Sequence, residues 1–502
     1  MTSGISETFD VIVVGSGSAG LAAAIAAAED GAKTLMIEKN PALGGTSGWS
    51  VGSITTSGSP HQKAAGIDDD PDRHFADMAL FHGNRLAGRD NERLRRLLVE
   101  QTPPTFDWLL GLGLVFYGPM PEPPHTRPRM HNVLPNSRMF IHRLSRYARR
   151  LGVEIRTSAP MEDLVCDDGR VTGVVVAGRP VAARRGVVLA MGDFSANPAL
   201  KQRYMPPEVA RIGPFNPTST GDWHEPVVAL GGRVVNGDVA LGPEIRFVPP
   251  ARETFVRRLP PWLWLARAVR WSIDTMPPRL VRPFVLGFLT TALMPSLELY
   301  RQGALLVNRR GERFADETGS PSDSMPDQPD GEAFVLMDGD LADAFQAWPN
   351  FVSTAPGIAY AYVDDYRRNR PDIFHRADTL AELAGKTGMN AAALERAVAA
   401  YNDSEAGGDR RRMEKPPFIA LGPVRAYIMA TDGGLAVDDR LRVLGEDDIP
   451  VPGLFAAGST GQGGLLLEGH GHHLGWGFTS GRIAGKNAAR KEAAPGAGPG
   501  AV

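Results

Sequence analysis

The first forty residues alternate between apolar runs and one glycine-rich turn. Residues 9–14 are almost wholly apolar, which is typical of a strand buried on both faces of a parallel sheet. Glycines follow at 15, 17 and 20, and an alanine-rich stretch at 21–28 predicts a buried helix. Residues 34–37 form a second apolar run that ends in an acid. The pattern predicts a β-α-β unit and therefore an α/β fold.

Helical and strand-like hydrophobic patterns also occur along the rest of the chain. Charged and apolar residues at helical spacing predict helices over 73–80, 91–110 and 139–151. Short apolar runs predict strands at 153–156, 161–166, 171–176 and 187–190. A last strand near 451–456 and a helix from about Gly475 are expected to return to the first sheet.

The glycine turn has the chemistry of a dinucleotide site. Gly15 permits a tight turn, Gly17 lets the backbone approach a pyrophosphate, and Gly20 allows close packing of helix on strand. Glu38 stands where a carboxylate accepts a ribose hydroxyl, and the helix N-terminus attracts the phosphates. The residues predicted to line the cofactor are Gly15, Gly17, Ser18, Ala19, Gly20, Glu38, Lys39, Gly44, Gly45, Thr46, Ser47, Gly52, Ala190, Gly192, Asp222, Gly458, Ser459, Gly475 and Trp476.

Two further segments indicate FAD rather than NAD. Gly44 and Gly45, followed by Thr46 and Ser47, form a paired-glycine loop directly after the second strand. Such a loop lets backbone and hydroxyl groups meet the pyrophosphate and ribitol of FAD. The strand and glycines at 451–459 can close the flavin site from the other end of the chain.

Composition excludes several other classes of protein. The chain has 502 residues, 43% of them hydrophobic and 22% charged, as expected for a soluble protein of more than one domain. The net charge of −3 does not favour nucleic acid as a partner. Cys166 is the single cysteine, which excludes a thiolate-bound iron–sulfur cluster and a redox dithiol within the chain. No second dinucleotide fingerprint is present, so electrons are expected to enter and leave through the flavin alone. No signal peptide is evident, so we expect a cytoplasmic location.

Several motifs resemble a known flavoprotein family. They are the fingerprint with Gly44, Gly45 and Thr46, the stretches at 190–195, 220–222 and 303–317, and the C-terminal glycines at 433–434 and 452–458. Together they resemble the soluble fumarate reductases, the succinate dehydrogenase flavoprotein subunits and the 3-ketosteroid dehydrogenases, with the last branch nearest.

The resemblance implies a Rossmann-like FAD-binding domain of the glutathione-reductase type with an inserted α+β capping domain. The FAD-binding domain would comprise residues 1–245 and 428–491, and the capping domain residues 246–427. Residues 492–502 would form a flexible tail. The substrate would lie between the cap and the flavin.

Departures from the family pattern narrow the substrate. Fumarate reductases hold a dicarboxylate with Arg and His side chains, but Ser320 stands in one of these arginine positions. Residues 427–431 lack the expected His, and residues 468–475 lack the expected Arg. Buried carboxylates without cationic partners are strongly disfavoured, which argues against fumarate or succinate. Two tyrosines of the ketosteroid dehydrogenases are also missing, at 467–469 and at Pro321.

The region 259–297 suggests a lipophilic substrate or a membrane surface. Residues 259–271 combine three Trp with Leu and basic residues, and 283–295 is apolar but too short to span a bilayer. The pattern fits the mouth of a lipophilic pocket or peripheral membrane contact. A buried cap core or an oligomer contact is the alternative.

Histidines near the C-terminus are the main catalytic candidates. His470, His472 and His473 lie in a glycine-rich segment that the resemblance places beside the flavin, and imidazole titrates near neutral pH. Tyr117, in a proline-rich loop, is the second candidate. No metal site is expected, because no acid or His stands nearby at helical spacing. The FAD is expected to be non-covalent, because residues 44–54 contain no His.

These features predict an FAD-dependent oxidoreductase acting on CH–CH groups. The expected reaction is α,β-desaturation of a steroid- or terpenoid-like ketone, with hydride transfer to flavin N5 and reoxidation by a diffusible quinone-like acceptor. One alternative is an ene-reductase that runs in the reverse direction. A non-catalytic FAD-binding or membrane-docking protein is the alternative of another class.

Overall fold

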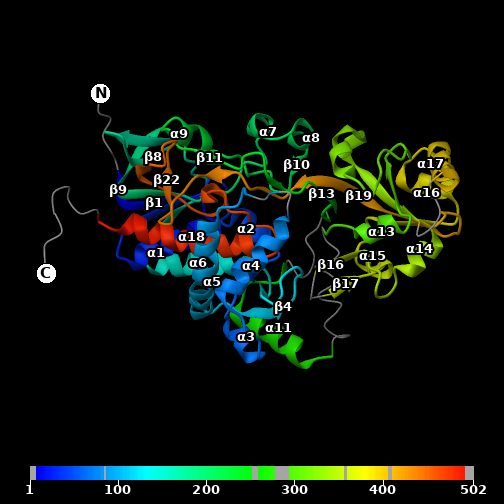
Figure 1. The fold of residues 1–502 in the computed structure, drawn as a ribbon, viewed down its shortest axis with the longest axis horizontal. Helices are drawn as coiled ribbons and strands as arrows, with labels where there is room; N and C mark the ends of the chain where they lie inside the picture. Colours follow the sequence, from blue (N-terminus) through cyan, green and yellow to red (C-terminus); the bar gives the residue numbers. More distant parts are fainter. Residues whose placement is uncertain are drawn as a thin grey trace.

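The computed structural model describes residues 7–83, 86, 88–250, 258–277, 293–355, 359–404 and 410–491. Figure 1 shows two lobes, and the N- and C-terminal parts of the chain come together in the left one. The predicted tail 492–502 and most of the apolar run 283–295 lie outside the described residues. None of the described helices is long and apolar enough to cross a membrane.

The first lobe is built on an eight-stranded, mostly parallel sheet. Its main path runs β22-β23-β9-β1-β2-β6, with β7 and β8 attached beside β9. β1 (Glu7–Val14) pairs in parallel with β2 (Thr34–Ile37) and β9 (Arg179–Leu189), and β9 pairs in parallel with β23 (Pro450–Ala456). The predicted β-α-β unit and the return of the C-terminal strand are thus confirmed.

The other elements of this lobe mostly lie where the sequence pattern predicts them. The remaining helices are α2 (Gly45–Trp49), α3 (Pro60–Ala64), α4 (Pro71–His82), α5 (Glu92–Gly111), α6 (Arg138–Arg150), α7 (Pro198–Tyr204), α8 (Pro207–Ala210), α9 (His224–Val228) and the 3-10 helix η3 (Gly458–Gly461). The remaining strands are β3 (Ser53–Thr55), β4 (Phe116–Met120), β5 (Met130–Val133), β6 (Glu154–Arg156), β7 (Asp163–Asp167), β8 (Arg170–Val176), β11 (Val234–Val235), β12 (Ala240–Leu241), β20 (Ala430–Thr431), β21 (Gly434–Leu435) and β22 (Arg442–Leu444).

Two helices from opposite ends of the chain pack backbone to backbone beside this sheet (Figure 1). They are α1 (Ser18–Glu29) and α18 (His472–Ala489). A Cβ at Gly481 would lie 2.2 Å from the carbonyl oxygen of Ala19, and one at Gly485 would lie 2.2 Å from that of Ala23. Only glycine therefore allows this separation. The predicted start of α18 near Gly475 is wrong by one turn, so His472 and His473 belong to the helix.

The second lobe contains a six-stranded, mostly antiparallel sheet. The long strand β19 (Phe418–Ile428) lies at its centre and pairs with β10, β13, β15 and β18. The sheet strands are β10 (Gly213–Pro214), β13 (Glu244–Phe247), β14 (Leu305–Asn308), β15 (Ala333–Met337) and β18 (Phe374–Ala377). The other elements are α13 (Leu297–Arg301), α14 (Gly339–Ala344), α15 (Val363–Asn369), α16 (Leu380–Thr387), α17 (Ala391–Ser404), β16 (Ser353–Ala355), β17 (Ala359–Ala361), η1 (Pro321–Asp327) and η2 (Pro329–Gly331).

The domain limits at 246 and 427 remain predictions. β13 begins at Glu244 and β19 ends at Ile428, so the sheet extends slightly beyond both limits. β10, which belongs to the same sheet, comes from much earlier in the chain.

Helix α11 (Leu263–Thr275) packs on the first lobe, near β4 in Figure 1. The guanidinium group of Arg270 donates to the carbonyl oxygen of Phe116 and lies 5.7 Å above the ring of Tyr117. Trp262, Trp264 and Trp271 are 51%, 63% and 60% exposed, so they do not form a buried cap core.

The close approach of α1 and α18 leads to a testable prediction for Gly485. We expect Gly485→Ala to lower the melting temperature and weaken FAD retention, because the new Cβ forces the helices apart. Gly385→Ala is the matched control, because Gly385 lies in α16 with nothing within 4 Å of a new Cβ. The control should be neutral or stabilising by up to about 1 kcal/mol. Thermal denaturation of both variants measures the difference, and equal effects would contradict the packing argument.

Candidate active site

The candidate cofactor site lies at the carboxyl ends of the parallel strands, where open α/β sheets bind their ligands. β1 ends before Gly15, β9 ends before Ala190, and β23 ends shortly before Gly458. Gly15 has a φ of 101°, and a Cβ there would lie 2.2 Å from the carbonyl oxygen of Ala190. A Cβ at Gly20 would lie 1.9 Å from the carbonyl oxygen of Gly15. Both residues must be glycine for the turn to pack on β9.

The start of α1 forms an open cradle of the kind that a pyrophosphate needs. The N-cap residue of this helix is Gly17, which has no side chain to cap it, so the positive dipole end of α1 lies at this turn. The backbone N–H of Ser18 donates to Oγ of Ser47 at 3.0 Å. A Cβ at Gly17 would come no closer than 3.4 Å to that oxygen, so glycine here keeps space open rather than relieving a clash. Ala19 follows in the same turn.

Glu38 is buried and tightly oriented at the end of β2. Its carboxylate accepts hydrogen bonds from the backbone N–H and the hydroxyl group of Ser16, at 3.0 and 2.6 Å, and from the backbone N–H of Asn40 at 2.8 Å. Oγ of Ser16 in turn accepts from the backbone N–H of Gly44 at 3.1 Å. Glu38 therefore holds the fingerprint turn and the Gly44–Gly45 turn together, and its role as ribose acceptor remains a prediction.

A second loop ties the remaining N-terminal candidates together. Nζ of Lys39 donates to Oδ2 of Asp222 at 2.8 Å, and Nδ2 of Asn216 donates to Oγ1 of Thr46 at 2.7 Å. Thr220 joins the Lys39–Asp222 pair through its hydroxyl group. These contacts support Asp222 as a residue that orders a loop beside the cofactor.

The C-terminal candidates close the same edge. The hydroxyl group of Thr460 donates to the carbonyl oxygen of Gly192 at 2.9 Å and so links η3 to the end of β9. The indole N–H of Trp476 donates to the carbonyl oxygen of Gly458 at 3.2 Å from a fully buried position. The indole thus packs in the core, and contact with the cofactor remains a prediction. The other three candidates on this side are Gly52, Ser459 and Gly475.

The three C-terminal histidines separate into three different environments. Nδ1 and the backbone N–H of His470 both bond to the carboxylate of Glu122, which raises the pKa of the imidazole. Glu244 and Arg246 of β13 also act on that pKa, so His470 lies close to the second sheet. Held as an ion pair with Glu122, His470 is poorly suited to act as a free base.

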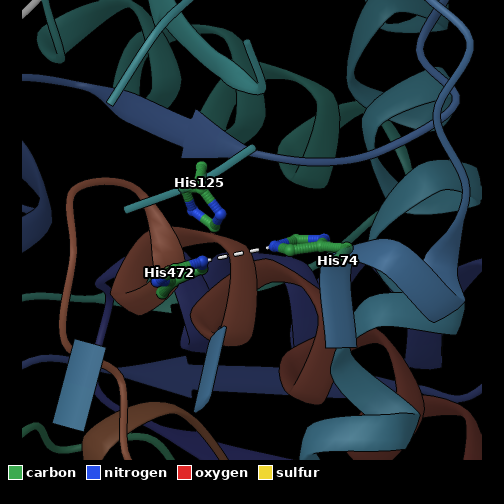
Figure 2. Close-up of side chains that lie close together, drawn as sticks. All are labelled: His74, His125 and His472. Carbon is green, nitrogen blue, oxygen red and sulfur yellow. Dashed lines mark hydrogen bonds between the residues drawn. The ribbon is translucent and has the colours of Figure 1, made fainter. Parts of the chain in front are cut away.

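His472 is directed into the first lobe. Its Nδ1 donates to the carbonyl oxygen of Glu468 at 2.6 Å, and its Nε2 lies 3.3 Å from Nε2 of His74 (Figure 2). Burial lowers the pKa of His472 to about 4, that of His125 to about 3, and that of His74 well below its ordinary value. His74 and His125 lie far from His472 in the sequence and reach it only through the fold, so local spacing gave no sign of this cluster.

His473 lies beside an acid that the sequence analysis missed. Nε2 of His473 is 3.9 Å from Oδ1 of Asp432, which also accepts a hydrogen bond from Nε2 of Gln462 at 2.7 Å. Burial, with a smaller contribution from the charge of Glu468, raises the pKa of Asp432 to about 7 despite the opposing hydrogen bond from Gln462. Burial also lowers the pKa of His473 to about 4.

Asp193 belongs to the same buried group. Burial raises the pKa of Asp193, and its charge acts on both Asp432 and His473. Asp193 directly follows Gly192 at the end of β9, so this group adjoins the cofactor edge. An acid directly before the glycine pair 433–434 was the signal in the sequence that could have identified Asp432.

Tyr117 lies in β4, half-buried, with its ring under the guanidinium group of Arg270. Its catalytic role remains a prediction.

The fold and the open glycine cradle define the chain as a flavin-binding oxidoreductase of the Rossmann type. A family model described as an FAD binding domain matches residues 10–253 and 264–466, and the chain belongs to this family. The predicted FAD cofactor, the FAD-dependent oxidoreductase class and the resemblance to fumarate reductases and ketosteroid dehydrogenases are thereby confirmed.

Curated relatives are similar over most of this chain. A probable fumarate reductase of Shewanella frigidimarina is 27% identical over 98% of this chain and 76% of its own length. A 4-oxocyclohex-2-ene-1-carboxylate 5-dehydrogenase of Sinomonas cyclohexanicum is 26% identical over 96% of this chain and 94% of its own length. The chain spans only 44% of an NADH:fumarate oxidoreductase of Klebsiella pneumoniae, at 25% identity over 90% of this chain.

Two solved structures share the fold. The open conformation of a flavocytochrome c3 fumarate reductase matches with a TM-score of 0.74 and 26% identity, over 97% of this chain and 79% of that chain. A 3-ketosteroid-Δ4-(5α)-dehydrogenase from Rhodococcus jostii matches with a TM-score of 0.61 and 25% identity, over 98% of this chain and 99% of that chain.

The cradle predicts which substitutions empty the site of FAD. Gly17→Val should yield colourless protein, because the branched side chain fills the space between α1 and Ser47. Gly213→Ala is the control, because Gly213 has nothing within 4 Å of a new Cβ. The ratio of flavin to protein absorbance after gel filtration measures retention. Full retention by a folded Gly17→Val variant would contradict this placement of the pyrophosphate.

Proposed function

We propose that this protein desaturates a lipophilic cyclic ketone between the carbons α and β to its carbonyl group. The observation that carries the proposal is the pair formed by the buried Asp432 and the partly exposed His473, beside the predicted cofactor edge. Bound FAD supplies the hydride acceptor for such a reaction. The protein then has to supply a group that takes the α proton, and Asp432 suits that role because its raised pKa makes it a competent base near neutral pH.

His473 would assist proton transfer through a hydrogen bond rather than through a positive charge. Its lowered pKa keeps the imidazole neutral at pH 7, so it can accept or donate a hydrogen bond without adding a fixed cation. Gln462 holds Asp432 from the other side through its amide group. The ketone oxygen would be oriented by an N–H group of His473 while Asp432 holds the proton, because Gln462 already donates to Asp432 and to the carbonyl oxygen of Leu465.

The charges of the site favour a neutral substrate. Asp193 and Glu468 both act on Asp432, so a substrate carboxylate placed there would meet acids rather than cations. Ser320 stands where the family resemblance would place one arginine for a dicarboxylate, and the stretch 468–475 lacks the other. Two relatives that this chain covers almost end to end are named as dehydrogenases, one of a 3-ketosteroid and one of 4-oxocyclohex-2-ene-1-carboxylate. Both names describe a cyclic ketone, and only the second carries a carboxylate.

The reverse reaction, reduction of an activated C=C bond, is the second candidate. The TM-score of 0.74 with the fumarate reductase structure favours it. Asp432 in its protonated form would then deliver the proton.

The two directions predict opposite pH dependence for the half-reaction. Desaturation needs deprotonated Asp432, so bleaching of the flavin by a saturated ketone should speed up as pH rises through about 7. Ene-reduction needs the protonated acid, so reoxidation of reduced flavin by an enone should slow down over the same range. The groups that face Asp432 are Gln462, Glu468, His82, Asp193 and His473. Anaerobic stopped-flow mixing with a panel of cyclic ketones and enones measures both rates.

Asp432→Asn should lower the rate of the active direction by at least ~10²-fold and abolish its pH dependence, with FAD still bound. Asp439→Asn is the control, because Asp439 is exposed. Unchanged turnover in Asp432→Asn would remove the acid from the mechanism. Failure of every ketone, enone and fumarate to change the flavin spectrum would favour the non-catalytic alternative.

We also propose a diffusible, quinone-like electron acceptor. With Cys166 as the single cysteine, the chain has no thiolate ligands for an iron–sulfur relay of its own. A lipophilic acceptor and a lipophilic substrate would both be reached at a membrane surface.

Helix α11 is the surface that we propose to meet the membrane. Trp262, Trp264 and Trp271 are all more than half exposed, and Arg267 on the same helix is exposed too. Indole rings beside a basic side chain are typical of segments that lie at the boundary of lipid headgroups and acyl chains.

The double change Trp264→Ser and Trp271→Ser should reduce binding to anionic phospholipid vesicles at least several-fold. Trp348→Ser is the matched control, since Trp348 is 64% exposed but lies in the second lobe. Co-sedimentation with vesicles measures binding. If wild-type protein stays in the supernatant, the proposal of membrane contact is wrong.

A further inference from the structure

We propose that His74, His125 and His472 form a binding site for a divalent transition-metal ion, with Zn²⁺ as the best match. The three residues come from α4, from the loop between β4 and β5, and from the first turn of α18, and they converge on one point (Figure 2). One ring nitrogen of each lies within 4.8 Å of the others. Three converging imidazoles are a ligand set that suits zinc, copper and nickel.

The distance between two of the ligands fits tetrahedral zinc. The Nε2 atoms of His74 and His472 are 3.3 Å apart, which is long for a hydrogen bond. Two nitrogens bound to tetrahedral zinc at about 2.0–2.1 Å lie about 3.3–3.4 Å from each other. The pair is thus already spaced as two ligands of one ion.

The second ring nitrogens support the same assignment. Nδ1 of His472 donates to the carbonyl oxygen of Glu468, which leaves the lone pair on Nε2 directed at His74. Among the described residues, Nε2 of His125 is buried without a hydrogen-bond partner and is free to bind a metal, whereas the unpaired Nδ1 of His74 is the nitrogen that does not face His472. A buried group of neutral imidazoles with unused nitrogens is costly unless something binds there.

The surrounding charges also favour a cation. Arg129 contacts His125 through Nη1 at 3.0 Å, but this guanidinium group is paired with both Asp69 and Asp77. Oδ2 of Asp77 lies 4.0 Å from Nδ1 of His125. Nδ1 of His125 accepts the hydrogen bond from Arg129, which fixes the orientation of the ring. Two carboxylates against one guanidinium group leave a net negative charge on this side of the site, and that charge favours a bound cation.

The expected effect of the ion is to fix the first turn of α18. His472 begins that helix, and His473 follows it with its side chain beside Asp432. A metal held by α4 and the loop at 125 would anchor this turn to two other segments. The site therefore positions His473 and does not itself require contact between metal and substrate.

The test measures binding rather than turnover. The FAD-loaded protein is treated with a chelator, titrated with ZnCl₂, passed through gel filtration and assayed for zinc by mass spectrometry. We expect about one zinc per chain in the wild-type protein, and at least ~10-fold weaker binding in His74→Gln and in His125→Asn. His375→Gln is the control, because this half-buried histidine lies in β18 of the second lobe.

Two further readouts separate the site from surface binding. Co²⁺ should give the intense visible bands of a tetrahedral site in wild-type protein and not in either variant. Zn²⁺ should raise the melting temperature of wild-type protein but not of the variants, because only the folded site binds it. Equal zinc retention by all proteins, or none by wild type, would overturn the proposal. The flavin spectrum of each variant checks that it is folded.

Discussion

Direct contact between the backbones of α1 and α18 is the constraint on which the rest of the structure depends. Gly481 and Gly485 let the last described helix lie against the first one, so the two ends of the chain form a single layer. Because α1 begins at the glycine turn that is predicted to hold the pyrophosphate and α18 begins at His472, the same packing aligns this turn with the histidines. Sequence segments more than four hundred residues apart thus form one site.

Much of the first lobe could be predicted from local patterns. Glycines at 15, 17 and 20 act through the backbone and Glu38 through its carboxylate, all within one β-α-β unit, so their spacing alone indicates their use. The start of α18 was missed because Gly471 and the two following histidines give no capping signal that a sequence reader would recognise. The fold class was predictable because periodicity is local. The second sheet is different, since its central strand pairs with segments drawn from all along the chain.

The chemistry of the histidines could not be predicted in the same way. The three side chains looked equivalent in sequence. In the structure His470 faces Glu122, His472 faces two other histidines, and His473 faces Asp432. At the start of a helix, successive residues point about 100° apart, so neighbours in sequence diverge in space. The hydrogen bond to Glu122 raises the pKa of His470, whereas burial lowers the pKa values of His472 and His473 to about 4. Only the tertiary structure shows which partner each one has.

The course of β19 links the two lobes mechanically. This strand crosses the centre of the second sheet and ends at Ile428, and the chain then passes through β20 directly to Asp432. A rotation of the second lobe would therefore pull on the short segment that carries this acid. The pKa of the proposed base, Asp432, would then depend on how far the two lobes are open. Closure over a bound substrate would therefore also change that pKa.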